Sequence, residues 1–151
     1  MGEVRWLDDA EYRAWIGYRR MRLLLDLRIA RDLADDSGLS EPDYDVLSNL
    51  SSTTDRRQRL NALAARMLWS KSRLSHHITR MERRGLVVRE ECADDARGAF
   101  VVLTEQGMRT IKEAAPAHVE SVRTHFIDLL TDEEIETLGD ITERVLARLA
   151  E

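Results

Sequence analysis

One segment constrains the fold of this chain most, and it reads SKSRLSHHITRMERRGLVVREECADDARGAFVVLT. Leu74, Ile78 and Met81 recur in it at i, i+4 and i+7, a spacing that places three apolar side chains on one face of a helix. Gly85 then supplies a helix stop, because glycine adopts the left-handed conformation without strain. The spacing therefore predicts a basic amphipathic helix over residues 71–84.

Two β-prone runs follow this glycine, residues 86–91 and 99–103, and the polar sequence between them predicts a hairpin with Arg97 near its tip. A short helix predicted over residues 59–67 precedes the basic helix and is joined to it by a tight turn, which indicates a helix-turn-helix. A helix-turn-helix followed by a hairpin is the layout of a winged helix-turn-helix. In that layout one element enters the major groove of DNA and another reaches the minor groove.

The basic charge of the chain is concentrated in the same region. The net charge is −5, but residues 56–89 carry ten Lys or Arg side chains against a single acidic one, Glu82. The flanking residues 1–55 and 90–151 are both acidic overall. A basic segment between acidic flanks is the pattern expected of a DNA-binding module. Taken alone, it is equally typical of a solvated helix.

The length and composition predict one cytoplasmic domain. A chain of 151 residues with 43% hydrophobic and 34% charged residues suits a soluble helical protein with its own core. The sequence has no apolar run of about 18 residues, and its amino terminus lacks the apolar region of a secretory signal. The single cysteine, Cys92, cannot form an internal disulfide. We therefore expect no membrane partner.

Three helix starts are predicted from their capping residues. Ser40 precedes an early proline, Ser70 precedes the basic helix, and Thr131 begins a sequence with Glu134 at the third helical position. Serine and threonine suit these positions because their hydroxyl groups accept a hydrogen bond from a backbone N–H that the helix leaves unpaired.

Long amphipathic helices are predicted on both sides of the central region, with a kink or interruption at Pro116. Their apolar stripes exceed what a compact winged domain could cover, so a second copy of the chain is the natural place to bury them. We expect a mainly α fold with a small β-hairpin wing, forming a single domain over residues 1–151. Residues 8–37 and 105–150 are then dimerisation helices, and residues 40–104 are the winged helix-turn-helix.

The polar face of the basic helix carries the side chains expected to contact DNA. Arg73, His76, His77 and Arg80 are spaced to form one stripe of hydrogen-bond donors for base edges. The amino terminus of the helix suits phosphate, and Arg84 suits the DNA backbone. An ordinary solvated pair is the alternative for the two histidines, whose directions differ by about 100° and disfavour joint metal binding. The residues expected to contact DNA from this helix are Ser70, Lys71, Ser72, Arg73, Ser75, His76, His77, Arg80 and Arg84.

Two residues of the predicted hairpin tip complete the expected DNA-binding set. Arg97 can enter the minor groove, where the negative potential favours a guanidinium group. Asp95 can hold that guanidinium in place through a bidentate pair. The alternative is a generic polar hairpin tip.

The pattern resembles the MarR family of bacterial transcription regulators. The resemblance is carried by SRLSHHITRMERRGLV, residues 72–87, and by DARGAFVVLTEQG, residues 95–107, and the flanking helices extend it over essentially the whole chain. It implies a homodimer that binds a pseudo-palindromic double-stranded operator, probing the minor groove with Arg97 supported by Asp95. The chain departs from the family at Leu68, where many relatives have a turn glycine.

The resemblance also implies a repressor released from DNA by a small effector. Aromatic walls with a cationic anchor suit an aromatic or anionic ligand. The residues proposed for such a pocket are Trp15, Tyr18, Arg19, Arg22 and Tyr44. The alternative is that each belongs to the core or surface of a dimerisation helix.

Other functional classes are less consistent with the sequence. Cys92 at the end of a wing strand favours a buried, inert thiol over a redox switch. His118 and His125 are nearly two helical turns apart, which favours surface or dimer contacts over metal binding. The sequence lacks a phosphate-binding loop, a nucleophile elbow and a metal-ligand motif, so we expect no enzyme activity, no metal and no cofactor. A protein-interaction module that keeps the fold without binding DNA is the remaining alternative.

Overall fold

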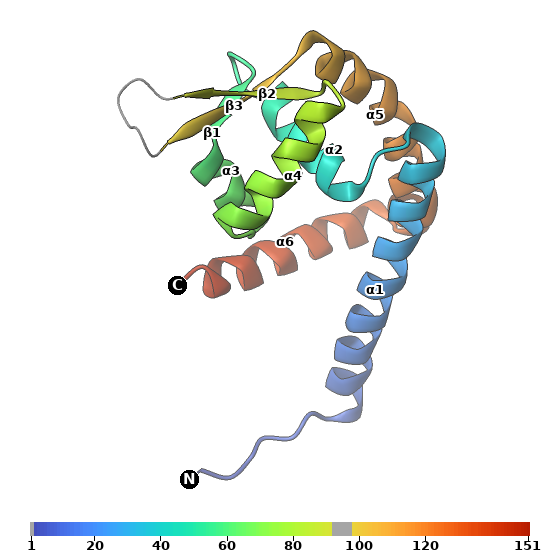
Figure 1. Cartoon of the computed structure of the whole chain (residues 1–151). Helices are drawn as coiled ribbons and strands as arrows, with labels where there is room; N and C mark the ends of the chain where they lie inside the picture. Colours follow the sequence, from blue (N-terminus) through green and yellow to red (C-terminus); the bar gives the residue numbers. More distant parts are fainter. Residues whose placement is uncertain (1, 92–97) are drawn as a thin grey trace. The chain divides into compact units, whose positions relative to one another are not determined.

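The computed structural model describes residues 2–91 and 98–151, which form mostly helices and one small sheet (Figure 1). The predicted mainly α fold with a small β wing is confirmed. The elements in chain order are α1 (Asp9–Ser37), α2 (Glu41–Ser51), β1 (Arg57–Arg59), α3 (Leu60–Met67), α4 (Lys71–Arg83), β2 (Val87–Glu91), β3 (Ala99–Leu103), α5 (Glu105–His125), the 3-10 helix η1 (Ile127–Leu129) and α6 (Asp132–Leu149).

The chain divides into two compact units. The winged unit is Leu33–Ala117, and it contains the whole region predicted to bind DNA. The helical unit combines Met1–Asp32 with His118–Glu151.

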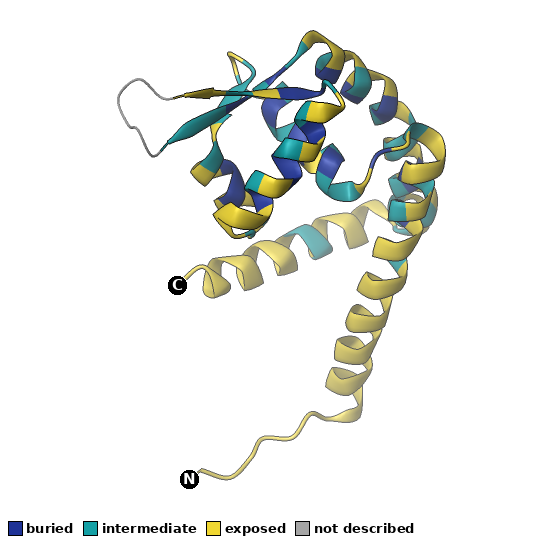
Figure 2. Cartoon of the chain, viewed as in Figure 1, coloured by how far each residue is buried: buried dark blue, intermediate teal, exposed yellow. Residues whose placement is uncertain are grey.

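The winged unit contains the main hydrophobic core. Buried side chains are concentrated on α2, α3, α4, the sheet and the first part of α5 (Figure 2). The three apolar residues predicted to face the core from the basic helix, Leu74, Ile78 and Met81, have no exposed surface. They pack with side chains from the neighbouring elements, including Val46, Leu47, Leu50, Leu63, Val87 and Val101. The buried face of α4 is therefore as predicted.

The sheet has three antiparallel strands in the order β1-β3-β2. The hairpin strands β2 and β3 were predicted, and they pair in register from Val87 opposite Leu103 to Glu91 opposite Ala99. The strand β1 was not predicted, because its sequence Arg-Gln-Arg has neither apolar alternation nor β-branched residues. Pairing with β3 imposes the extended conformation on it. Arg59 therefore belongs to a strand, and α3 begins one residue later than predicted.

The predicted helix starts are confirmed. Ser40 and Asp43 form a capping box at α2, and Thr131 and Glu134 form another at α6. The hydroxyl of Ser70 accepts the backbone N–H of Arg73 at 3.1 Å. Local hydrogen bonding of this kind depends on residues three apart, which explains why sequence reasoning finds it.

Leu68 adopts the left-handed conformation, with φ 57° and ψ 36°, at the turn between α3 and α4. Leu68 therefore occupies, in the left-handed conformation, the turn position at which many relatives have a glycine. A residue with a Cβ atom is strained there by about 1–2 kcal/mol. The Leu68 side chain is 92% exposed, so the strain is not offset by packing within the chain.

The helix α5 continues through Pro116 and ends at His125. The sequence predicted a kink or interruption at this proline and a helix reaching about residue 130. The helix is not interrupted at Pro116, and the segment after α5 forms the short η1. Every helix of the described ranges, residues 2–91 and 98–151, is too short or too polar to span a lipid bilayer.

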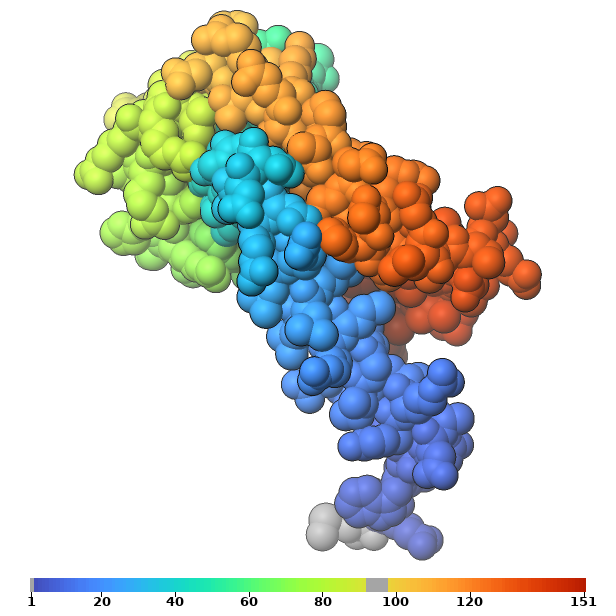
Figure 3. Space-filling model, turned by 90° about the vertical axis from the view of Figure 1, so that its right-hand side faces the viewer, coloured from blue at the N-terminus to red at the C-terminus, as the bar shows by residue number. Residues whose placement is uncertain are grey.

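The helical unit exposes much of its apolar surface. Leu23, Leu24 and Leu27 of α1 are each more than half exposed, and none of the residues of α6 is buried. The side chains of the blue amino-terminal half of α1 lie at the surface in Figure 3. Polar contacts stabilise the unit where Ser121 donates to Asp32 at 2.7 Å and His125 lies 3.1 Å from the same carboxylate.

Gly107 provides a test of how α5 joins the sheet. A Cβ atom at this position would lie 2.1 Å from the carbonyl oxygen of Leu86 and 2.7 Å from a side-chain carbon of Leu103. Gly107→Ala normally favours a helix by about 1 kcal/mol, but here we expect a loss of about 3 kcal/mol in unfolding free energy from the backbone clash. Urea unfolding measures the change. Gly17→Ala is the control, because a Cβ atom there meets nothing within 4 Å. Equal stability of the two variants would contradict the packing described.

Candidate DNA-binding surface

The outer face of α4 presents a row of polar and basic side chains. Lys71, Ser72, Arg73, His76 and Arg80 are all exposed, as the helical spacing predicted. The buried residues on the opposite face hold the helix against the core, so this row faces solvent. The arrangement supplies guanidinium, imidazole and hydroxyl groups on one helix of 13 residues, which can donate to base edges and phosphates.

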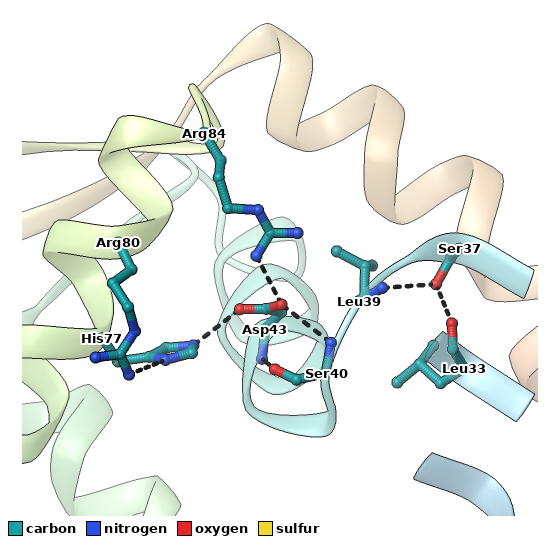
Figure 4. Close-up of polar contacts among 8 residues, drawn as sticks. All are labelled: Leu33, Ser37, Leu39, Ser40, Asp43, His77, Arg80 and Arg84. Carbon is teal, nitrogen blue, oxygen red and sulfur yellow. Dashed lines mark hydrogen bonds and ion pairs between the residues drawn. The ribbon is translucent and has the colours of Figure 1, made fainter. Parts of the chain in front are cut away.

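His77 does not belong to this exposed row, and the prediction that it does was wrong. Its side chain is only 7% exposed, and its Nε2 lies 3.0 Å from Oδ1 of Asp43 (Figure 4). The physical reason is its position on the helix. Residue 77 lies three positions after Leu74 and four before Met81, which places it at the border of the buried face. The helical spacing is compatible with either a buried or an exposed side chain at this position. His77 is buried because it contacts Asp43, which lies 34 positions away in the chain.

Asp43 is the buried acid at the centre of this cluster, with 4% of its surface exposed. Its Oδ2 accepts the backbone N–H of Ser40 at 3.0 Å and Nη1 of Arg84 at 2.8 Å. Burial by itself raises the pKa of the Asp43 carboxyl, but the contacts with His77, Arg84 and Ser40 outweigh it and hold that pKa well below its usual range. One carboxylate therefore joins the start of α2 to α4 and to the residue that follows α4. Sequence reasoning did not select Asp43, because its only local signal is that of a helix cap.

Arg84 has a structural partner in addition to its expected role at the DNA backbone. Its side chain is 43% exposed while one nitrogen pairs with Asp43. The guanidinium group has five donors, and the pair with Asp43 occupies one of its terminal nitrogens.

Arg89 of β2 connects the wing to α4. Its guanidinium donates to the hydroxyl of Ser75 at 2.9 Å and to that of Thr79 at 3.1 Å, and it also pairs with Glu82. The Ser75 hydroxyl, which was expected to contact DNA, is thus engaged by Arg89. Sequence reasoning missed this residue because a single arginine in a predicted strand carries no local pattern. The contacts fix the orientation of the wing strands relative to α4.

Trp69 contacts Arg73, one of the arginines of the exposed row. The guanidinium carbon of Arg73 lies 3.7 Å from the centroid of the Trp69 ring, a cation–π contact. The same ring meets the imidazole of His77 edge-on, with centroids 5.6 Å apart. Sequence reasoning treated Trp69 only as part of a turn.

The predicted wing-tip residues Asp95 and Arg97, together with Cys92, lie outside the described residues. Within the sheet, the guanidinium carbons of Arg57 and Arg59 lie 4.0 Å and 5.2 Å from the centroid of the Phe100 ring. The unpredicted strand β1 therefore adds two further cations to the winged unit.

The residues proposed for an effector pocket are divided between the two units: four lie on α1 in the helical unit, and Tyr44 lies in the winged unit. Trp15 and Tyr18 are half exposed on α1, with ring centroids 6.2 Å apart, and Arg19 lies 5.8 Å from the Trp15 ring. Arg22 is exposed on the same helix, whereas Tyr44 packs against the core of the winged unit. Two cavities of the helical unit, of about 360 and 410 Å³, are lined by other residues, among them Met21, Phe126 and Leu130.

The histidines of α5 have structural neighbours. His125 contacts Asp32, and its Nε2 also lies 3.3 Å from Nε of Arg28. Within residues 2–91 and 98–151, no group of three or more His, Cys, Asp or Glu side chains is placed to hold a metal ion.

Acid titration tests the role assigned to Asp43. The folded-state pKa lies below the ordinary value of 3.8, so the stabilisation by Asp43 is fully present above that value and is lost as the pH falls below it. Asp43→Asn should lower the unfolding free energy at neutral pH by about 1.5–3 kcal/mol and weaken its dependence on pH below about 4. Urea unfolding across this range measures both effects. Asp55→Asn, at an exposed loop position, is the matched control. An unchanged acid dependence in Asp43→Asn would refute the assignment.

Comparison with known proteins agrees with this geometry. A model of the MarR family matches residues 37–98. The chain is 44% identical to AbsC, a MarR family transcriptional regulator from Streptomyces coelicolor, with 97% of this chain and 99% of that chain covered and a TM-score of 0.92. It is 37% identical to Sco3205, a MarR family transcriptional regulator from the same organism solved in complex with DNA, with 99% and 93% covered and a TM-score of 0.94. It is also 30% identical over 129 residues to the transcriptional regulator HosA from Escherichia coli O127:H6, covering 85% of this chain and 93% of HosA. The chain belongs to the MarR family of transcriptional regulators.

Proposed function

We propose that this protein is a homodimeric repressor that binds a pseudo-palindromic double-stranded DNA operator in a sequence-specific manner. The observation that carries the proposal is the exposed basic face of α4, held against the core by three fully buried side chains. The similarity to Sco3205, which was solved in complex with DNA, supports it. A regulator of this kind acts on the chromosome, so we place it in the cytoplasm and assign it no enzymatic role.

The geometry supports different roles for different residues of α4. Arg73 and Arg80 are exposed on the outer face and can each donate two hydrogen bonds to O6 and N7 of guanine. Ser70 and Lys71 lie at the amino terminus of the helix, where backbone N–H groups attract phosphate. Ser72 and His76 are exposed beside them and suit smaller base or phosphate contacts.

The wing is assigned to the minor groove on the basis of the sequence. Arg97 is expected to enter that groove with Asp95 as its support. The contacts of Arg89 with α4 favour this division, because they fix the wing strands beside the helix that enters the major groove.

Homodimerisation follows from the exposed apolar side chains of α1 and α6. Val145, Leu146 and Leu149 of α6 are 51%, 63% and 75% exposed, and several leucines of α1 are similarly open. A patch of this kind is unfavourable in water and marks an interface. A two-fold axis would place two copies of α4 about 34–36 Å apart, one turn of DNA.

Release from DNA by a small aromatic or anionic effector is the further part of this proposal. The cluster of Trp15, Tyr18 and Arg19 supplies aromatic surface beside a cation. A protein-interaction module without DNA binding is less consistent with the chain, because such a module gains nothing from the basic face of α4.

DNA binding is tested first with an operator selected from random duplexes. We expect a protected pseudo-palindrome of about 20 base pairs and an affinity that falls steeply with salt concentration, because bound phosphates release counterions. Arg80→Ala should weaken binding to this operator by about 1–3 kcal/mol and change binding to unrelated duplexes much less. Fluorescence anisotropy at several salt concentrations measures both affinities.

Arg83→Ala provides the comparison, since Arg83 is exposed near the end of the same helix. A phosphate contact by Arg83 would weaken both duplexes alike. Failure of the wild-type protein to bind any duplex at low salt would refute the proposed function.

The dimer is tested by placing a charge on α6. Leu146→Glu adds a carboxylate to the apolar face, and two-fold symmetry places two such charges in one interface. We expect a shift from dimer to monomer, measured by analytical ultracentrifugation. Glu143→Gln on the same helix should leave the assembly unchanged. A wild-type protein that sediments as a monomer at all concentrations would contradict the interface.

A further inference from the structure

We propose that His77 is a positioning residue, which holds the guanidinium group of Arg80 in a fixed orientation on the DNA-binding face. The inference rests on the proposed function, because it assigns to Arg80 a contact with DNA. It goes further by giving a buried side chain, which cannot itself reach DNA, a role in how the exposed one binds.

The contacts of the imidazole ring carry this inference. Its Nδ1 lies 3.2 Å from Nη2 of Arg80, and its Nε2 lies 3.0 Å from Oδ1 of Asp43 (Figure 4). The ring therefore bridges an exposed arginine of α4 and a buried carboxylate of α2.

The chemistry of these partners determines where the imidazole holds its hydrogen. A guanidinium group can only donate, so Nδ1 must accept and cannot hold a hydrogen. A neutral imidazole then has its hydrogen on Nε2, the ring nitrogen that lies 3.0 Å from Oδ1 of Asp43. A doubly protonated ring would instead turn a donor toward the donors of Arg80. The bridge thus requires the neutral ring with its hydrogen on Nε2.

Three further contacts restrain the ring and its anchor. The Trp69 ring meets the imidazole edge-on at 5.6 Å between centroids, which limits rotation of the imidazole. Asp43 is itself held by the backbone of Ser40 and by Arg84. The charged groups that face His77 are therefore Asp43 of α2 and Arg80 of α4, with Arg84 on the far side of the carboxylate.

A fixed Arg80 binds DNA more readily than a free one. A long flexible side chain loses rotamer freedom when it is immobilised in an interface, which reduces affinity by about 2- to 12-fold for one such side chain. The His77 contact orders Arg80 before DNA arrives, so part of this loss is already incurred on folding. Removal of His77 should therefore weaken operator binding by about this factor without removing any atom that touches DNA.

Two conservative substitutions separate the two ends of the bridge. An asparagine side chain places a polar atom near the position of Nδ1, and a glutamine side chain reaches the position of Nε2. His77→Asn should keep the acceptor for Arg80 and retain operator affinity. His77→Gln should keep the contact with Asp43 and show the loss, as should His77→Leu. Thermal unfolding of each variant separates a change in stability from a change in DNA binding.

A double-mutant cycle tests whether the effect passes through Arg80. His77→Gln should weaken binding to the selected operator in the wild-type background and have no further effect in Arg80→Ala. The matched cycle with Arg83→Ala should show no coupling, because the contacts of His77 do not include Arg83. Equal effects of His77→Gln in all three backgrounds would show a purely structural role and overturn the inference. Retention of full operator affinity by His77→Gln would overturn it as well.

The tautomer of His77 gives a measurement that does not require DNA. Nitrogen-15 chemical shifts of the full-length protein should show the hydrogen on Nε2, and Arg80→Ala should shift the Nδ1 resonance. A ring with hydrogen on Nδ1 would overturn the inference even if DNA binding is normal. If the tautomer is as expected but the wild-type protein binds no duplex, the proposed function fails while the contact with Arg80 stands.

Discussion

The candidate DNA-binding surface is organised around one buried carboxylate. Asp43 caps the start of α2, contacts His77 of α4 and pairs with Arg84 just after that helix. A carboxylate this deeply buried is unfavourable unless its oxygens have hydrogen-bonding or charged partners. The partners of Asp43 come from the start of α2, from α4 and from the residue that follows α4. His77 and Arg84, which lower the pKa of Asp43, are therefore also the residues through which Asp43 links α2 to α4. Leu74, Ile78 and Met81 pack α4 against the hydrophobic core, and Asp43 adds polar contacts between the start of α2 and the end of α4.

A similar use of polar contacts joins the wing to the same helix. Arg89 of β2 contacts Ser75, Thr79 and Glu82 of α4, so the strand and the helix share one set of hydrogen bonds. At the other end of the sheet, Gly107 lets α5 approach the backbone of Leu86 more closely than any other residue could. The exposed row of α4 and the wing strands are consequently parts of one rigid framework. Recognition elements that are ordered before binding lose less entropy when they meet DNA.

The two units differ in how their apolar surface is covered. The winged unit buries its own core, whereas α1 and α6 leave large apolar side chains open to solvent. The helical unit therefore lacks a complete core of its own. A second copy of the chain would cover those helices and, through the two-fold axis, would present two basic faces to one operator.

Elements whose signals are local could be predicted from the amino-acid sequence. The spacing of Leu74, Ile78 and Met81 gave the buried face of α4, and the capping serines gave its start and that of α2. Features that depend on partners distant in the chain could not be predicted in this way. The strand β1 exists through its pairing with β3, and His77 is buried because Asp43 lies 34 residues away in the chain but 3.0 Å away in space. Helical periodicity does not settle whether a residue at the edge of the apolar face is buried or exposed. A contact with a separate element settles it, as Asp43 does for His77.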